Sequence, residues 1–96
     1  MVDAGVRERL LNAVEVLATS ADPLPLRIAQ LVPTLIPLRA ADFGDATTGE
    51  AFAALVERMR RNGTWEQTAV AMSPEDARAW ASQLIAVVKA SWRAKD

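Results

Sequence analysis

Residues 73–94, SPEDARAWASQLIAVVKASWRA, contain the clearest helix signal in the chain. Ser73 is a preferred N-cap residue, Pro74 suits the first helical position, and two acidic residues then meet the positive end of the helix dipole. The apolar residues that follow recur at helical spacing and form a stripe about 160° wide, made of Ala77, Trp80, Ala81, Leu84, Ile85, Val87, Val88 and Trp92. We therefore predict a helix over about 74–94 with more apolar surface than one core contact requires.

The N-terminal segment predicts another amphipathic helix, over about residues 4–20. Asp3 is the candidate N-cap, and Asp22-Pro23 ends the helix because proline disfavours the helical conformation of the residue before it. The main apolar arc is formed by Val6, Leu10, Ala13, Val14, Leu17 and Ala21. Leu11 and Val16 lie on either side of this arc, so this helix also has apolar surface to spare.

Residues 24–38, LPLRIAQLVPTLIPL, are strongly apolar and contain three prolines. Prolines argue against a central strand. We predict a buried helix over about 25–36, because Pro25 fits the first turn and the last proline would end the helix. Pro33 would remove one backbone hydrogen bond and either kink the helix or split it. An irregular conformation of residues 28–38 is the alternative.

Residues 39–47 predict a loop, since they are rich in turn formers, and Phe43 is expected to anchor this loop in the core. The next helix is expected over about 48–61, because Thr47 and Glu50 have the spacing of a capping box. Its apolar face is narrow and consists of Phe52, Leu55, Val56 and Met59.

Asn62-Gly63 is a strong helix stop, since both residue types tolerate the left-handed backbone conformation. Thr64 and Gln67 again have capping-box spacing, which predicts a short helix over about 65–71. The side chains expected to face inward from this segment are Trp65, Ala69 and Met72.

Together these segments predict an all-α fold, a compact single-domain bundle of four to five helices that spans residues 1–96. The apolar helix interrupted by proline is expected to be central. No run of about 18 apolar residues is present, so no membrane span is expected. The N-terminal residues are charged where a signal peptide needs an apolar run, so we expect a cytoplasmic protein.

The chain contains no Cys, His or Tyr. Their absence excludes disulfides, thiolate nucleophiles and imidazole or thiolate metal sites, and it removes the commonest general base. The remaining carboxylate pairs are Glu75-Asp76 and Asp42 with Asp45, which the helix dipole and turn formation explain. We therefore expect no enzymatic activity, no cofactor and no metal site.

The excess apolar surface instead favours a non-enzymatic protein-interaction module, such as a small adaptor, regulatory subunit or accessory subunit of a larger bacterial or phage complex. Tryptophan is enriched at binding hot spots, and Trp92 lies near a helix end where exposure is expected. The predicted contact residues are Trp92, Ile85 and Val88 on the last helix, with Leu11 and Val16 on the first. The partner is expected to be another protein or a second copy of the chain.

Arg58, Arg60 and Arg61 form the one basic cluster, and we expect them to be a polar rim of the contact surface. The alternative function is a nucleic-acid-binding regulator, in which these arginines contact phosphates. Two observations weigh against it. The net charge is −1, and the predicted helix over 65–71 has none of the basic residues that a recognition helix normally carries.

Overall fold

The computed structural model describes residues 4–61 and 63–93, and all the regular secondary structure within these ranges is helical. The elements are α1 (Ala4–Thr19), α2 (Leu24–Leu35), the 3₁₀ helix η1 (Ala40–Phe43), α3 (Ala46–Arg58), α4 (Trp65–Val70) and α5 (Pro74–Arg93). The predicted all-α bundle is therefore confirmed. None of the helices in the described part of the chain is both long enough and apolar enough to cross a membrane.

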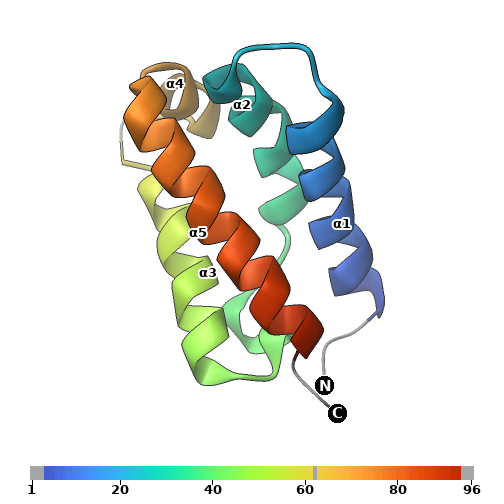
Figure 1. The fold of residues 1–96 in the computed structure, drawn as a ribbon. Coiled ribbons are helices and arrows are strands. Elements are labelled where there is room, and N and C mark those ends of the chain that lie inside the picture. Colours follow the sequence, from blue (N-terminus) through green and yellow to red (C-terminus); the bar gives the residue numbers. More distant parts are fainter. Residues whose placement is uncertain (1–3, 62, 94–96) are drawn as a thin grey trace.

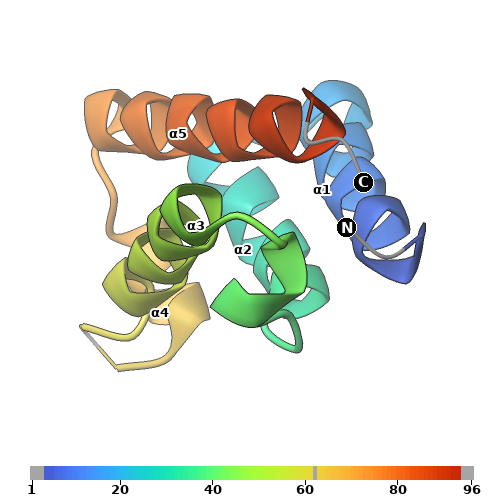
Figure 2. The same ribbon diagram turned by 90° about the horizontal axis from the view of Figure 1, so that it is seen from below.

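The proline-containing helix α2 is central, as predicted, because it packs against α1, α4 and α5. Helix α5 forms one side of the molecule, α2 and α3 lie on its inner side, and α1 lies beside its C-terminal end (Figure 2). The C-terminal end of α5 lies beside the N-terminal end of α1, and the two helices diverge from there (Figure 1). This arrangement leaves α1 and α5 as neighbours at one edge of the bundle.

Helix α2 is continuous through Pro33, so the proline neither ends nor splits it. The predicted range of about 25–36 differs from the observed helix by one residue at each end. Pro33 is exposed, whereas Ile28, Leu31 and Leu35 are buried. The carbonyl that loses its amide partner therefore lies on the outer side of the helix, where water can bond it at low cost.

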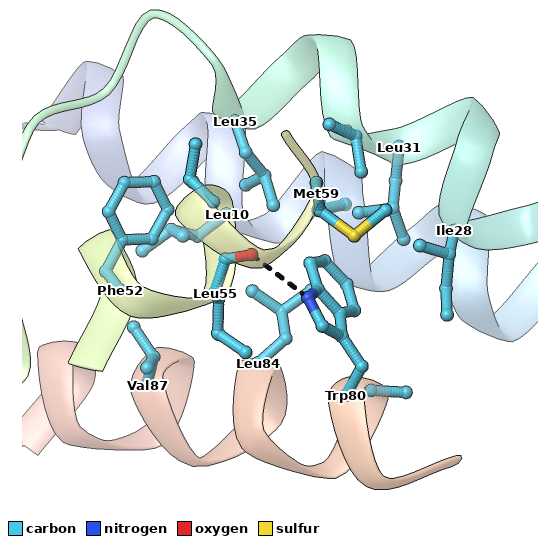
Figure 3. Close-up of a cluster of buried hydrophobic side chains, with 14 of the residues drawn as sticks. Leu10, Ile28, Leu31, Leu35, Phe52, Leu55, Met59, Trp80, Leu84 and Val87 are labelled. Carbon is cyan, nitrogen blue, oxygen red and sulfur yellow. Dashed lines mark hydrogen bonds between the residues drawn. The ribbon is translucent and has the colours of Figure 1, made fainter. Parts of the chain in front are cut away.

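The core is organised around Trp80 of α5, which is fully buried (Figure 3). Its indole Nε1 donates a hydrogen bond to the carbonyl oxygen of Leu55 in α3, at 3.2 Å. A buried indole N–H without a partner would cost about 1–3 kcal/mol, so this bond makes the tryptophan acceptable in the core. The other large, fully buried side chains are Phe43, Phe52, Leu10, Ile28, Leu31, Leu35, Met59, Leu84 and Val32.

Arg27 of α2 links this helix to α1 through two hydrogen bonds to backbone carbonyls, which the sequence patterns do not predict. Its Nη1 donates to the carbonyl of Leu17 at 2.8 Å, and its Nε donates to the carbonyl of Asp22 at 2.7 Å. The last carbonyls of a helix lack partners within the helix, and a cation is favoured near them. Arg27 therefore both caps the end of α1 and positions it on the central helix.

The start of α3 corrects the predicted capping box. Asp45 is the N-cap, since its carboxylate accepts from the amide of Thr48 at 3.0 Å and from the Thr48 hydroxyl at 2.6 Å. These hydrogen bonds lower the pKa of Asp45. Thr47 and Glu50 lie inside the helix. The predicted box was wrong because Asp45, two residues before Thr47, is also a preferred N-cap residue and accepts from the amide three residues after it.

The predicted loop over 39–47 contains the 3₁₀ helix η1. Phe43 anchors it as expected, with its ring centroid 4.7 Å from that of Phe52 in α3. Gly49 lets η1 and α3 approach closely, because a Cβ at this position would lie 2.4 Å from the carbonyl oxygen of Ala40. Helix α3 ends at Arg58, three residues before the predicted end.

The capping signals of the last two helices are confirmed. Thr64 accepts from the amide of Gln67 at 3.2 Å, and the Gln67 side chain accepts from the amide of Thr64 at 3.1 Å. Ser73 accepts from the amide of Asp76 at 3.1 Å and so begins α5. Gly63 has the positive φ of 97° expected of the helix stop. The predicted N-cap Asp3 and the first residue of the stop, Asn62, lie outside the described residues.

Candidate functional site

Three of the five predicted contact residues are large apolar side chains exposed to solvent. Leu11 is 47% exposed, Ile85 is 38% exposed and Trp92 is 45% exposed. Val16 and Val88 are half-buried and pack against the core. The other exposed large apolar residues among those described are Leu26 of α2 and Val70 of α4.

The contact between Arg7 and Trp92 shows which flank of α1 faces α5. The guanidinium carbon of Arg7 lies 5.9 Å from the centroid of the Trp92 ring. Successive residues of a helix are about 100° apart, so Leu11, four residues after Arg7, lies only about 40° from it around the helix. Leu11 is therefore on the flank of α1 that faces α5.

The matching flank of α5 carries the remaining exposed residues. Ile85, Val88 and Trp92 follow one another at spacings of three and four, which places them within about 60° around the helix. Since Trp92 contacts Arg7 of α1, this whole flank is directed toward α1. We call the surface formed by Arg7, Leu11, Ile85, Val88 and Trp92 the α1/α5 face.

Arg7 holds part of the Trp92 ring in place. A guanidinium within about 6 Å of an indole centroid is attracted by the negative face of the ring. The Nε of Arg7 is buried and has no hydrogen-bond partner among the described residues. The contact restrains the orientation of Trp92 while nearly half of its surface stays exposed.

Val16 does not belong to the α1/α5 face, contrary to the prediction. It lies seven residues after Arg9, which is about 20° from it around the helix. The Nη1 of Arg9 donates to the carbonyl of Thr34 in α2, at 3.4 Å. Val16 is thus on the flank of α1 that faces α2. Residues on opposite sides of one apolar arc cannot both face the same neighbour, and only the side with Leu11 faces α5.

The predicted polar rim is also corrected, because the arginines lie elsewhere. The Nη1 of Arg58 donates to Oε1 of Gln83 at 2.8 Å. Gln83 is about 160° around α5 from Ile85, so Arg58 is on the opposite flank of that helix. Arg58 and Arg61 border a pocket of about 290 Å³ together with Asp76. The three residues are brought together by the turn after α3 and the first turn of α5.

Arg60 is separated from the other two arginines. It borders a different pocket, of about 220 Å³, which η1 and α3 form and which Arg39 also lines. The basic cluster of the sequence is therefore divided between two surfaces, and each of these also carries an acidic residue, Asp76 in one and Glu57 in the other. This placement gives the three arginines no shared, uniformly basic surface for a phosphate backbone.

The rim of the α1/α5 face consists of charged residues that the sequence analysis passed over. Glu8 and Glu15 lie three residues before and four residues after Leu11 on the exposed side of α1. Arg78 and Lys89 lie seven residues before and four residues after Ile85 on the exposed side of α5. None of these four side chains has a hydrogen-bond or ion-pair partner within the described ranges, 4–61 and 63–93. Their spacing from Leu11 and Ile85 was the signal that could have found them.

The three tryptophans occupy three different environments. Trp80 is buried and hydrogen-bonded, and Trp92 is exposed on the α1/α5 face. Trp65 of α4 is half-buried against the core, and its Nε1 is buried with no hydrogen-bond partner in the described part of the chain. Only Trp92 therefore offers a large aromatic surface to a partner.

The described residues contain no group of three or more His, Cys, Asp or Glu side chains that could hold a metal ion. Asp42 and Asp45, the acids considered for a cation, are used as caps of η1 and α3. No protein-family model, curated protein or solved structure matches this chain. The α1/α5 face is accordingly the candidate site on physical grounds alone.

Proposed function

We propose that the protein is a non-enzymatic interaction module that docks on a protein through the α1/α5 face. The observation that carries the proposal is the exposure of Leu11, Ile85 and Trp92 on one surface made by two adjacent helices. Scattered exposed apolar residues are ordinary, whereas large apolar side chains gathered on one surface and bordered by charge are typical of an interface.

The composition of the face suits protein binding better than nucleic-acid binding. Tryptophan is a preferred anchor at protein interfaces, and Arg7 already restricts the orientation of the Trp92 ring. A partly fixed aromatic side chain loses less conformational entropy when a partner covers it. The basic residues that would be needed for a phosphate backbone are divided between two other surfaces.

Site-specific photo-crosslinking tests the proposal. A photoreactive phenylalanine analogue at position 85, on the face, is compared with the same analogue at position 70, where Val70 is 57% exposed on α4. Irradiation of cells that naturally make the protein is expected to yield discrete adducts from position 85 and none from position 70. An absence of adducts at position 85, or the same adducts at both positions, would contradict a docking role for this face.

A further inference from the structure

The charges on the outer rims of the α1/α5 face are sorted by helix, whereas Arg7 is a cation of α1 that lies inside the face against Trp92. The exposed rim of α1 carries Glu8 and Glu15, and the exposed rim of α5 carries Arg78 and Lys89. The apolar residues Leu11, Ile85 and Trp92 lie between these two rims. A surface with an acidic edge on one side and a basic edge on the other is complementary to a turned copy of itself.

We propose that the occupant of the α1/α5 face is a second copy of this chain, related by a two-fold axis that runs along the face between α1 and α5. This inference rests on the proposed docking role of the face and names its partner. Rotation about such an axis places α1 of each copy opposite α5 of the other, in antiparallel direction. The acidic rim of α1 then meets the basic rim of α5, and this happens twice in the dimer.

The charge pattern selects this axis over the other symmetric arrangement. An axis that runs across the two helices would place α1 on α1 and α5 on α5. Glu8 and Glu15 would then face their own copies, and so would Arg78 and Lys89, which like-charge repulsion disfavours. The two arrangements bury the same apolar residues, so the charged rims decide between them.

Glu8 and Lys89 lie at similar heights along the face. Arg7 contacts Trp92 and so gives a common level for the two helices. Glu8 lies about 1.5 Å beyond this level on α1, and Lys89 lies about 4.5 Å beyond it on α5, in the same direction. Glu8 therefore faces Lys89 of the second copy most directly. Glu15 lies about 12 Å and Arg78 about 21 Å beyond the common level, so these two side chains do not lie directly opposite each other.

The number of apolar anchors on the face suits a weak, specific dimer. A standard interface removes about 800 Å² from each partner, roughly one seventh of the 5709 Å² accessible surface of this chain. Each copy supplies three exposed apolar anchors and one half-buried one, Val88. A Kd on the order of micromolar is expected for an interface of this size with so few anchors.

Charge reversal tests the proposal, with sedimentation equilibrium over a concentration series from micromolar to millimolar. The wild-type protein is expected to reach twice the chain mass of 10.4 kDa. Glu8→Lys and Lys89→Glu are each expected to weaken dimerisation about tenfold or more, because each creates two like-charge contacts in the symmetric dimer. The double variant E8K/K89E restores opposite charges across the interface and is expected to restore dimerisation.

The controls separate pairing from general effects of charge. Arg61→Glu replaces a positive charge by a negative one, as Lys89→Glu does, but at an exposed site away from the face. It is expected to leave dimerisation unchanged. Circular dichroism of each variant establishes that it is folded. Loss of dimerisation in both single variants without recovery in the double variant would overturn the proposed axis.

A wild-type protein that stays monomeric up to millimolar concentration would overturn the second copy as the occupant. The docking role of the face is tested separately by the photo-crosslinking experiment, and an absence of adducts at position 85 would contradict it. A monomer with discrete adducts of a different protein at position 85 would therefore retain the docking face and replace its partner.

Discussion

The two flanks of α5 differ in how they meet their neighbours. Toward α3 the helix is bridged by the bonds from Trp80 to Leu55 and from Arg58 to Gln83, at 3.2 and 2.8 Å. This flank borders an open groove of about 410 Å³, lined by Thr47, Thr48, Ala51, Ala54, Gln83, Ala86, Val87 and Ala90. Mostly small side chains line this groove, whereas the flank toward α1 carries Ile85, Val88 and Trp92.

The difference shows how one wide apolar stripe serves two purposes. Residues near the centre of the stripe, such as Trp80 and Leu84, are fully buried in the core. Residues at its α1 edge reach a neighbour that diverges from α5, so they are only partly covered (Figure 1). The first flank is hydrogen-bonded to α3, and the second retains large apolar side chains that the fold leaves partly exposed.

Replacing each tryptophan of α5 by alanine gives the largest contrast between the two flanks. Trp80→Ala removes a fully buried side chain and its hydrogen bond to Leu55. We expect it to lower the free energy of unfolding by about 3–5 kcal/mol. Trp92→Ala removes a side chain that is nearly half exposed, and about 1 kcal/mol is expected. Urea unfolding followed by circular dichroism measures both, and equal losses would contradict the distinction.

Gly49→Ala tests the close approach of η1 and α3. Alanine in a helix interior is normally about 1 kcal/mol better than glycine. Here its Cβ would lie 2.4 Å from the backbone oxygen of Ala40, so the backbone must move. We expect a net destabilisation of about 1–3 kcal/mol.

The matched control for that substitution is a surface position on the same helix. Thr47→Ala changes an exposed residue in the first turn of α3. It is expected to change the free energy of unfolding by less than about 0.5 kcal/mol. A stabilised Gly49→Ala variant would show that the two elements are not in close contact.

The cap of α3 makes a smaller, pH-dependent contribution. Hydrogen bonds from Thr48 lower the pKa of Asp45 in the folded protein. The stability that this cap contributes is therefore present above the ordinary aspartate pKa of about 3.9 and is lost as the pH falls through the lower folded value. Asp45→Ala is expected to lower the midpoint of thermal unfolding by a few degrees at neutral pH.

Asp45→Asn separates the charge from the cap. Asparagine is also a good N-cap, so most of the stability at neutral pH should remain. Thermal unfolding between pH 6 and about pH 2.5 compares the variants, and the gap between wild type and Asp45→Ala should close at the acidic end. A gap that is constant across this range would contradict the role of the ionised carboxylate.

Polar substitutions on the α1 flank should have the smallest effect on folding. Leu11→Gln and Ile85→Gln replace exposed side chains, and each is expected to change the free energy of unfolding by less than about 0.5 kcal/mol. Their effect is expected on association, which should weaken because the apolar anchors are lost. Unfolding and sedimentation measurements on the same samples test both parts. Stability losses above about 1 kcal/mol would show that these residues belong to the core.

Much of the fold was predictable because its signals are local. Ser73 and the Thr64–Gln67 box begin their helices through bonds to amides only three residues away. The apolar periodicity of α1 and α5 likewise identifies the residues that can be buried. The wrong prediction at α3 also has a local cause. Asp45 and Thr47 are both suitable N-cap residues, and Asp45, two residues earlier, is the one that begins the helix.

The burial of single residues was less predictable where a polar side chain forms its hydrogen bond within its own helix. Ser91 was not assigned to the core, yet it is fully buried in α5. Its hydroxyl donates to the carbonyl of Val88 at 2.8 Å, within its own helix, so no partner from another element is needed. A residue type that is usually exposed can therefore fill a core position when the helix supplies its acceptor.

The sequence by itself determined which residues lie at each angle around α1 and α5, because that angle follows from about 3.6 residues per turn. Only the tertiary structure decided which neighbour each angle faces. Leu11 and Val16 are equivalent on the helix surface, but α5 covers one flank of α1 and α2 covers the other. The α1/α5 face, its charged rim and the separation of Arg60 from Arg58 and Arg61 all depend on packing between distant segments, which no local spacing contains.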